Sequence, residues 1–255
     1  MKRTLLDMVQ EILSDMDSDE VESIDDTVES EQVVTIIKST FYSMMSNRLW
    51  PHLHRSVQLK PISDTSKPTH MKLQDEIKEL SFINYNKAKS GDSRKKYEAV
   101  KYLAPDQFIH KTNQNDDSQS NVLTVADFGG IELFVRNDAA PTYYTSFDDS
   151  HLVFDSYDSE VDSSLQESKV QAQAYIIPSW NIVPGYENEF VPDLPDDAFT
   201  ALVEEAKSRA SLRLRQVADQ KAEQEAGRQN RWLARKARRV AGGIKYPNYG
   251  RVGRK

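Results

Sequence analysis

The chain changes its hydrophobic periodicity twice, and this order limits the folds that it can adopt. Near both ends, apolar residues recur every three or four positions, which is typical of amphipathic helices. Over about residues 52–192 apolar and polar residues alternate instead, and Val, Ile, Tyr and Phe are frequent, which is typical of half-buried strands. The expected fold class is therefore α+β: a helical bundle built from both chain ends, with an inserted β-rich domain that is sandwich or barrel-like.

Residues 1–51 are expected to form the N-terminal helices of this bundle. An apolar stripe predicts the first helix over residues 4–16. The second is expected to begin at a capping box of Asp26 and Glu29. It is expected to end before Pro51, because a proline disfavours the helical conformation in the residue that precedes it.

Residues 193–241 are expected to form one long C-terminal helix that completes the bundle. The segment opens with aspartates around Pro195, which suit the first turn of a helix and the positive end of its dipole. Its apolar stripe runs from Phe199 to Val217 and then thins to alanines. The distal half is therefore expected to need a partner surface, since it lacks an apolar face of its own.

The C-terminal part of the chain differs in charge from the rest. Residues 207–255 hold 15 Lys and Arg against 3 Asp and Glu, a net charge of +12, whereas the remainder holds 18 against 37, a net charge of −19. Residues 242–255 contain four of the nine glycines and are expected to form an extended basic arm. Such a split predicts that the C-terminal part has a partner of its own.

Composition excludes several classes of protein. With no cysteine among its 255 residues, the chain has no disulfide, no thiolate nucleophile and no cysteine-ligated metal. No apolar run approaches the roughly 18 residues of a membrane span, and the amphipathic start differs from a secretory signal. A soluble protein without a membrane partner is expected.

No set of residues predicts an enzyme, a cofactor site or a metal site. Residues 127–129 spell Asp-Phe-Gly, but the other kinase motifs are missing, so a turn after a strand is expected there. The acidic run at 15–19 starts like a calcium loop but lacks the required glycine. His52 and His54 would share a strand face, yet no further histidine stands at metal-ligand spacing.

The basic cluster of the C-terminal helix is the strongest candidate binding feature. Three interpretations remain open: docking on an acidic protein surface, binding of nucleic-acid phosphates, and a solvated helix without a partner. Protein docking is favoured because Arg and Trp are enriched at the energetic centres of interfaces, and because it also accounts for the glycine-rich arm. The cluster consists of Arg228, Arg231, Trp232, Arg235, Lys236, Arg238 and Arg239.

Several segments together carry a family resemblance that covers most of residues 4–240. They are Thr4–Leu13, Ile24–Glu29, Asn47–Pro51, Pro141–Asp149, Val153–Asp158 and Asp193–Pro195. These segments resemble the head-to-tail adaptor, or connector, proteins of short-tailed phages (podoviruses), the family of tail tubular protein A.

The resemblance implies a structural virion protein at the head–tail interface, with no cofactor. It implies a ring of twelve copies that joins the portal protein to tail nozzle or tail fibre proteins, with genomic DNA passing through the channel without specific binding. The C-terminal extension would clamp the portal, and loops of the β domain would contact the tail. Carried onto this chain, the portal-docking residues are Arg228, Arg231, Trp232, Arg235, Lys236, Arg238, Arg239, Tyr246, Tyr249, Arg251 and Arg254.

The difference in charge between the body and the C-terminal part fits an adaptor, and it is also compatible with a second function. An acidic body would repel packaged DNA from a channel wall, and a basic tail would be steered toward acidic neighbours. The alternative is a nucleic-acid-binding module that uses the same basic helix. Its affinity for duplex DNA would fall on the order of tenfold or more between low and moderate salt.

Overall fold

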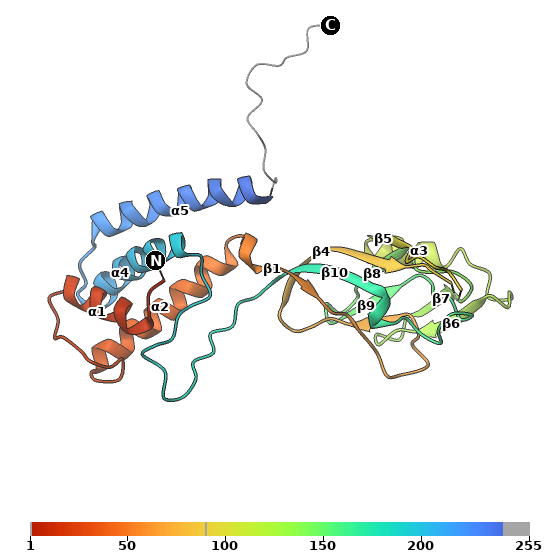
Figure 1. Cartoon of the computed structure of the whole chain (residues 1–255), viewed down its shortest axis with the longest axis horizontal. Helices are drawn as coiled ribbons and strands as arrows, with labels where there is room; N and C mark the ends of the chain where they lie inside the picture. Colours follow the sequence, from red (N-terminus) through yellow and green to blue (C-terminus); the bar gives the residue numbers. More distant parts are fainter. Residues whose placement is uncertain (1, 90, 242–255) are drawn as a thin grey trace, which may run out of the picture. The chain divides into compact units, whose positions relative to one another are not determined.

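The structure is a computed structural model that describes residues 2–89 and 91–241, with side chains up to Lys236. The chain forms two units, which are described separately below. A helical unit joins the chain up to Leu53 with the chain from Pro178 onward, and a β unit spans His54–Ile177 (Figure 1). The segment 178–192, which the sequence placed in the β-rich domain, thus belongs to the helical unit.

The described part of the helical unit contains four α-helices and two short 3₁₀ helices. Asp7 and Thr4 form the capping box that begins the first helix. The second begins at a capping box of Thr27 and Ser30 rather than of Asp26 and Glu29, because the Asp26 carboxylate accepts hydrogen bonds from the preceding turn. The elements are α1 (Leu5–Asp15), α2 (Val28–Ser46), η1 (Pro51–Leu53), η3 (Asp196–Ala198), α4 (Phe199–Leu214) and α5 (Gln220–Ala241).

The core of the helical unit lies where α4 packs against α1 and α2. Phe41 of α2 and Leu202 of α4 are completely buried there, as is Ile12 of α1. Trp180, from the segment that leads back from the β unit, packs its ring 5.1 Å from that of Phe41. Burial of side chains from both ends of the chain makes the two ends one folding unit.

The single long C-terminal helix expected over 193–241 is wrong. Helix α4 ends at Leu214, and Gln216 adopts a left-handed conformation with φ 55°, which turns the chain. Val217, which the apolar stripe placed in the packing face, is 64 % exposed. Asp219 then caps a separate helix by accepting a hydrogen bond from the Ala222 amide, so two shorter helices replace the long one.

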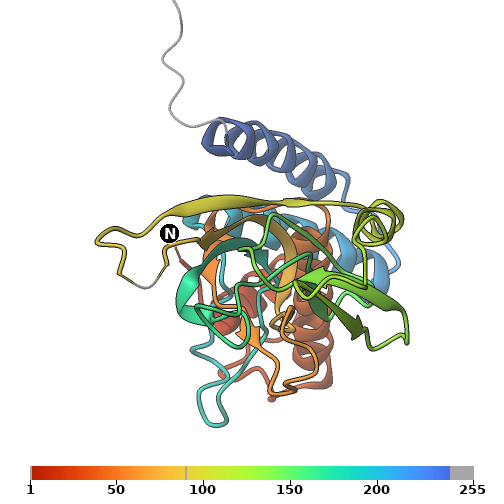
Figure 2. The same cartoon turned by 90° about the vertical axis from the view of Figure 1, so that its right-hand side faces the viewer.

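The β unit is one curled sheet of eight strands with a separate two-stranded hairpin, rather than a sandwich or a closed barrel. The order in the sheet is β1-β10-β4-β5-β8-β9-β3-β2, and the hairpin pairs β6 with β7 (Figure 2). The elements are β1 (His54–Val57), β2 (Lys60–Pro61), β3 (His70–Lys72), β4 (Ile77–Asn86), β5 (Tyr97–Tyr102), α3 (Pro105–Thr112), β6 (Val122–Ala126), β7 (Glu132–Arg136), β8 (Tyr143–Thr145), β9 (His151–Phe154), η2 (Glu167–Lys169) and β10 (Val170–Ile176).

Two hydrophobic clusters hold the β unit together. Leu59, Ile83 and Phe154 are completely buried in the cluster of the main sheet. Phe108 of α3 and Leu133 of β7 anchor a second cluster, which joins the hairpin to the sheet. Helix α3 was not predicted, because the sequence pattern indicated strands throughout this range and the helix has only eight residues.

We predict that residues 54–177 fold in isolation. Their two ends lie side by side, because His54 and Tyr175 are partners in the antiparallel pair of β1 and β10. Excision therefore cuts the chain at the boundary between the two units. Urea unfolding of this fragment, followed by far-UV circular dichroism, is expected to be cooperative. A gradual transition without baselines would show that the β unit needs the helical unit.

Candidate protein-docking surface

Helix α5 packs on its own unit through a narrow side of small residues. Ala222 and Ala226 are buried against this unit, and Leu233 is 4 % exposed, so the buried side follows three- and four-residue steps. The Arg48 guanidinium fastens the middle of the helix by donating to the carbonyl and the side chain of Asn230. The expectation that the distal half cannot be held by its own domain is therefore wrong, because α4 and α5 pack together.

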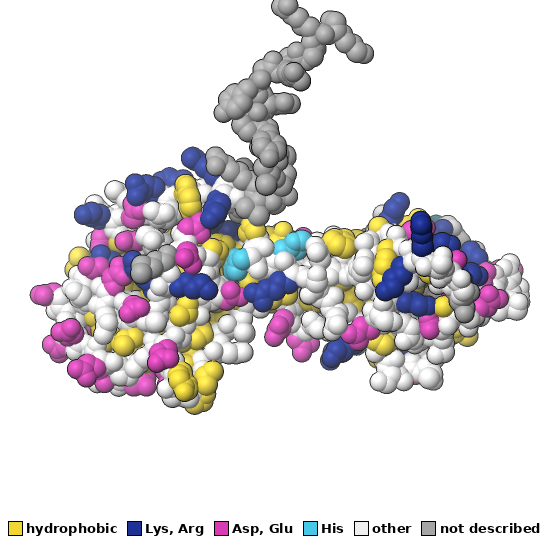
Figure 3. Space-filling model, in the orientation of Figure 1, with side chains coloured by type: hydrophobic (Ala, Val, Ile, Leu, Met, Phe, Trp, Pro, Cys, Tyr) yellow, Lys and Arg dark blue, Asp and Glu magenta, His cyan; other side chains and the backbone are white. Residues whose placement is uncertain are grey.

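The opposite side of α5 presents arginines to solvent. Arg228, Arg231 and Arg235 are exposed, and their spacing puts them on the side that faces away from the buried alanines. Trp232 lies beside them with 48 % of its surface exposed. Figure 3 shows Lys and Arg side chains along this outer side of the helix. The structure thus brings together four of the predicted docking residues on one face.

The remaining predicted residues separate from this face or lie outside the described part. The Lys236 ammonium forms an ion pair with Asp197 and lies 5.5 Å from the centre of the Trp232 ring. Arg238 and Arg239 belong to α5, but their side chains are outside the described residues. Outside the described residues altogether lie Tyr246, Tyr249, Arg251 and Arg254.

An apolar pocket lies at the side of α5 that faces its own unit, where α5 meets η1 and η3. Its volume is about 140 Å³. The sequence analysis did not predict this pocket, because its walls come from three segments that are distant along the chain. Pro51 and Pro195, which line it, mark the ends of helical segments but do not by themselves indicate a pocket. The lining residues are Trp50, Pro51, His52, Pro195, Asp197, Leu233 and Lys236.

Carboxylates gather on the other side of the helical unit. The loop between α1 and α2 and the start of α2 carry the exposed Asp17, Asp19, Asp25, Asp26 and Glu31. Figure 3 shows Asp and Glu side chains on the side of this unit away from α5. The helical unit is therefore electrostatically polar, with a basic side on α5 and an acidic side on the α1–α2 loop.

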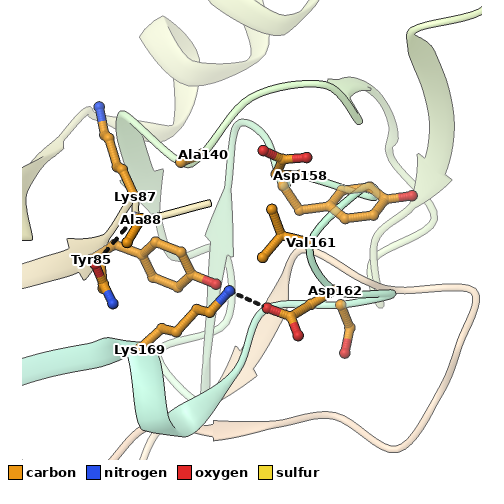
Figure 4. A pocket seen from close by; sticks show the side chains of 11 residues that line it. Tyr85, Lys87, Ala88, Ala140, Asp158, Val161, Asp162 and Lys169 are labelled. Carbon is orange, nitrogen blue, oxygen red and sulfur yellow. Dashed lines mark hydrogen bonds and ion pairs between the residues drawn. The ribbon is translucent and has the colours of Figure 1, made fainter. Parts of the chain in front are cut away.

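Metal-ligating side chains do not cluster among the described residues. No group of three His, Asp or Glu side chains among them is placed to hold a metal ion. A cavity of the β unit, between Tyr85 and Lys169, measures about 10 Å³, which is room for roughly one water molecule (Figure 4). The Lys169 ammonium pairs with Asp162 there, and burial raises the pKa of Tyr85 to about 12. These groups hold the fold together and leave no space for a substrate.

The Asp-Phe-Gly segment forms the turn between β6 and β7, as predicted, and its aspartate has a structural partner. Asp127 lies 3.0 Å from Nε2 of His70 on β3, and both side chains are almost completely buried. Asp127 also accepts a hydrogen bond from the Gly129 amide, which shapes the turn. The pair ties the hairpin to the main sheet. Burial lowers the pKa of His70, because desolvation penalises its protonated form more than Asp127 favours it.

No model of a known protein family matches the chain, and no curated protein matches its sequence. None of the helices in the described residues has the length and apolarity that crossing a membrane requires.

We predict that Leu233→Ala lowers the free energy of unfolding by about 2–3 kcal/mol, because it leaves a cavity between α5 and the unit beneath it. The neighbouring Trp232→Ala, which removes a half-exposed side chain, is expected to cost less than about 1 kcal/mol. Chemical denaturation of both variants measures the difference. Equal, small effects would show that α5 does not pack as described.

We predict that the β unit loses stability as the pH falls from about 7 to about 5. His70 is neutral in the folded state, and its pKa there is below that of the unfolded chain. The unfolded state therefore binds more protons in this window, and unfolding becomes easier as the pH falls. Urea midpoints across this range should fall less steeply for His70→Gln than for the parent. His110→Gln, at an exposed position, is the control and should follow the parent.

Proposed function

We propose that this protein is a structural adaptor of a short-tailed phage, which joins the capsid portal to the tail as a ring of twelve copies. The observation that carries the proposal is the row of Arg228, Arg231 and Arg235 beside the exposed Trp232, on the side of α5 that its own unit leaves uncovered. Exposed Trp and Arg side chains on one helix face have the composition of an interface centre. We assign this face to the portal protein.

The sequence resemblance supplies the identity of the partners. In the adaptor family the C-terminal extension clamps the portal, and in this chain the predicted extension follows α5 in the sequence. Loops of the β unit would contact tail nozzle or tail fibre proteins. The body of the chain, with its net charge of −19, would line a conduit that genomic DNA passes without specific binding.

The positive charge of the arginine face would also set the order of assembly. The arginine face is exposed in the single chain, so an acidic portal surface would attract it before contact and speed association. This attraction would weaken with added salt, whereas burial of Trp232 in the completed contact would not. The adaptor would thus add to a portal that is already in place, and its role would be structural, without an enzymatic activity.

A second candidate, a nucleic-acid-binding module, is favoured by the same row of arginines. Their positions one helical turn apart suit a series of phosphate contacts. Glu225, however, forms an ion pair with Arg228 at 2.7 Å and places a carboxylate on this face. That carboxylate would repel phosphates and favours a protein partner.

We predict that Arg231→Glu weakens binding to portal rings from the same phage on the order of tenfold or more, because it reverses a charge at the centre of the face. Arg213→Glu, on an exposed position of α4, makes the same charge change away from this face and should bind as the parent does. Surface plasmon resonance measures the affinities, and electron microscopy of the mixture shows whether rings form.

The same titration with duplex DNA separates the two candidates. The adaptor is expected to bind free DNA weakly at moderate salt. Tight, steeply salt-dependent DNA binding that Arg231→Glu abolishes, together with unchanged portal binding, would replace the adaptor proposal with the nucleic-acid one.

A further inference from the structure

The helical unit carries a rigid apolar projection on the segment between β10 and η3. Val183, Pro184, Gly185 and Tyr186 form a turn in which the Tyr186 amide donates to the Val183 carbonyl at 3.0 Å. Gly185 has φ 85°, so the turn has proline and glycine where a type II turn requires them. Val183 and Tyr186 stand out from it, 62 % and 61 % exposed. Tyr186 is the most exposed aromatic side chain of the described residues.

This turn is fixed to the unit that carries it. On its N-terminal side the buried Trp180 packs against Phe41 and Phe190, with ring centres 5.1 Å and 4.8 Å away. On its C-terminal side Asn188 accepts hydrogen bonds from the amides of Leu6 and Ile24. The backbone that carries the two exposed apolar side chains is thus anchored on both sides before any partner arrives, which lowers the entropic cost of docking.

The apolar pocket between α5, η1 and η3 has a matching size. Its volume of about 140 Å³ is close to the ~150 Å³ of a cavity that accepts one benzene ring. Trp50, Leu233 and two prolines supply apolar walls. The pocket therefore has room for one aromatic side chain, and the ring of Tyr186 is of that kind.

The turn and the pocket lie on different sides of the same unit. In Figure 1 the teal segment between β10 and η3 forms a loop that descends on the side away from α5. The pocket is lined by Leu233 and Lys236 of the C-terminal half of α5 and by Pro195, where this segment reaches η3. A chain cannot fill its own pocket with this turn. Two copies can, and such a head-to-tail contact repeats from copy to copy until a ring closes.

Charge favours the same pairing. Glu187 and the exposed Glu189 follow directly on Tyr186. The pocket is lined by Lys236, which pairs with Asp197 of the same lining, and the Arg48 guanidinium lies 4.9 Å from the centre of the Trp50 ring. Approach of Glu187 and Glu189 of one copy to Lys236 and Arg48 of the next is therefore attractive.

We propose that Tyr186 of one copy inserts into the pocket of Trp50, Pro195 and Leu233 on the next copy, and that this contact links neighbouring subunits head to tail. The contact itself does not depend on the proposed function. Only the statement that repeated contacts close into a ring rests on it. It leaves Arg228, Arg231 and Arg235 free for the portal, since they lie on a different side of α5 from Leu233 and Lys236.

Disulfide trapping tests the contact in the full-length chain, where every disulfide is engineered because no cysteine is present. In the chain with Val183→Cys and Lys236→Cys, oxidation is expected to give a ladder of covalent oligomers on a non-reducing gel. A mixture of the two single variants is expected to give only dimers. Leu212→Cys with Lys236→Cys, which moves the first thiol to an equally exposed site on α4, is the control. A double variant that stays monomeric, or a control that gives the same ladder, would overturn the proposal.

A second substitution identifies the side chain that fills the pocket. Added to the trapping variant, Tyr186→Ala is expected to slow ladder formation on the order of tenfold. Tyr42→Ala, at another exposed aromatic of the helical unit, should leave it unchanged. Deletion of residues 242–255 should also leave the ladder intact. Loss of the ladder on this deletion but not on Tyr186→Ala would show that the C-terminal segment fills the pocket instead.

Two variants distinguish failure of the subunit contact from failure of the proposed adaptor function. Tyr186→Ala is expected to abolish rings while single copies still bind the portal, whereas Arg231→Glu is expected to weaken portal binding while the ladder persists. If Arg231→Glu leaves portal binding intact and Tyr186→Ala removes the ladder, the subunit contact stands and the portal assignment fails.

Discussion

The packing of α5 against α4 determines which side chains of α5 remain exposed to a partner. Ala222, Ala226 and Leu233 allow α5 to lie close to the unit, and this close approach leaves its arginine side uncovered. A larger side chain at Ala226 would hold the helix away and open the pocket of Trp50 and Leu233. One narrow apolar contact therefore sets both the exposed basic face and the apolar pocket.

The helical unit carries two features that the proposed connector would use, and each comes from a different part of its surface. Its arginine face would offer positive charge and an aromatic ring to the portal. Its turn at Tyr186 and the pocket at Leu233 would offer a projection and a recess to a neighbouring copy. A heterologous contact of this kind would join subunits into a ring without using the face proposed to meet the portal.

Much of this organisation could be predicted from the sequence, and the parts that could not have specific physical causes. The stripe from Phe199 to Ala210 is buried as its spacing indicates. The reversal at Gln216 gave no comparable signal, because a non-glycine residue at φ 55° depends on its surroundings more than on its type. The sequence predicted a basic cluster around Trp232 on the C-terminal helix. It could not show that Lys236 pairs with Asp197, since that contact joins residues far apart in the chain.

Radical footprinting of the leucines and of Trp232, in the free chain and with portal rings, tests the central claim most directly. The account predicts that Leu233 is labelled far more slowly than the exposed Leu212 in the free chain. It predicts that Trp232 is labelled in the free chain and protected once the portal is added. Labelling of Leu233 as fast as that of Leu212 would contradict the packing of α5, and a Trp232 that stays reactive on the portal would contradict the docking face.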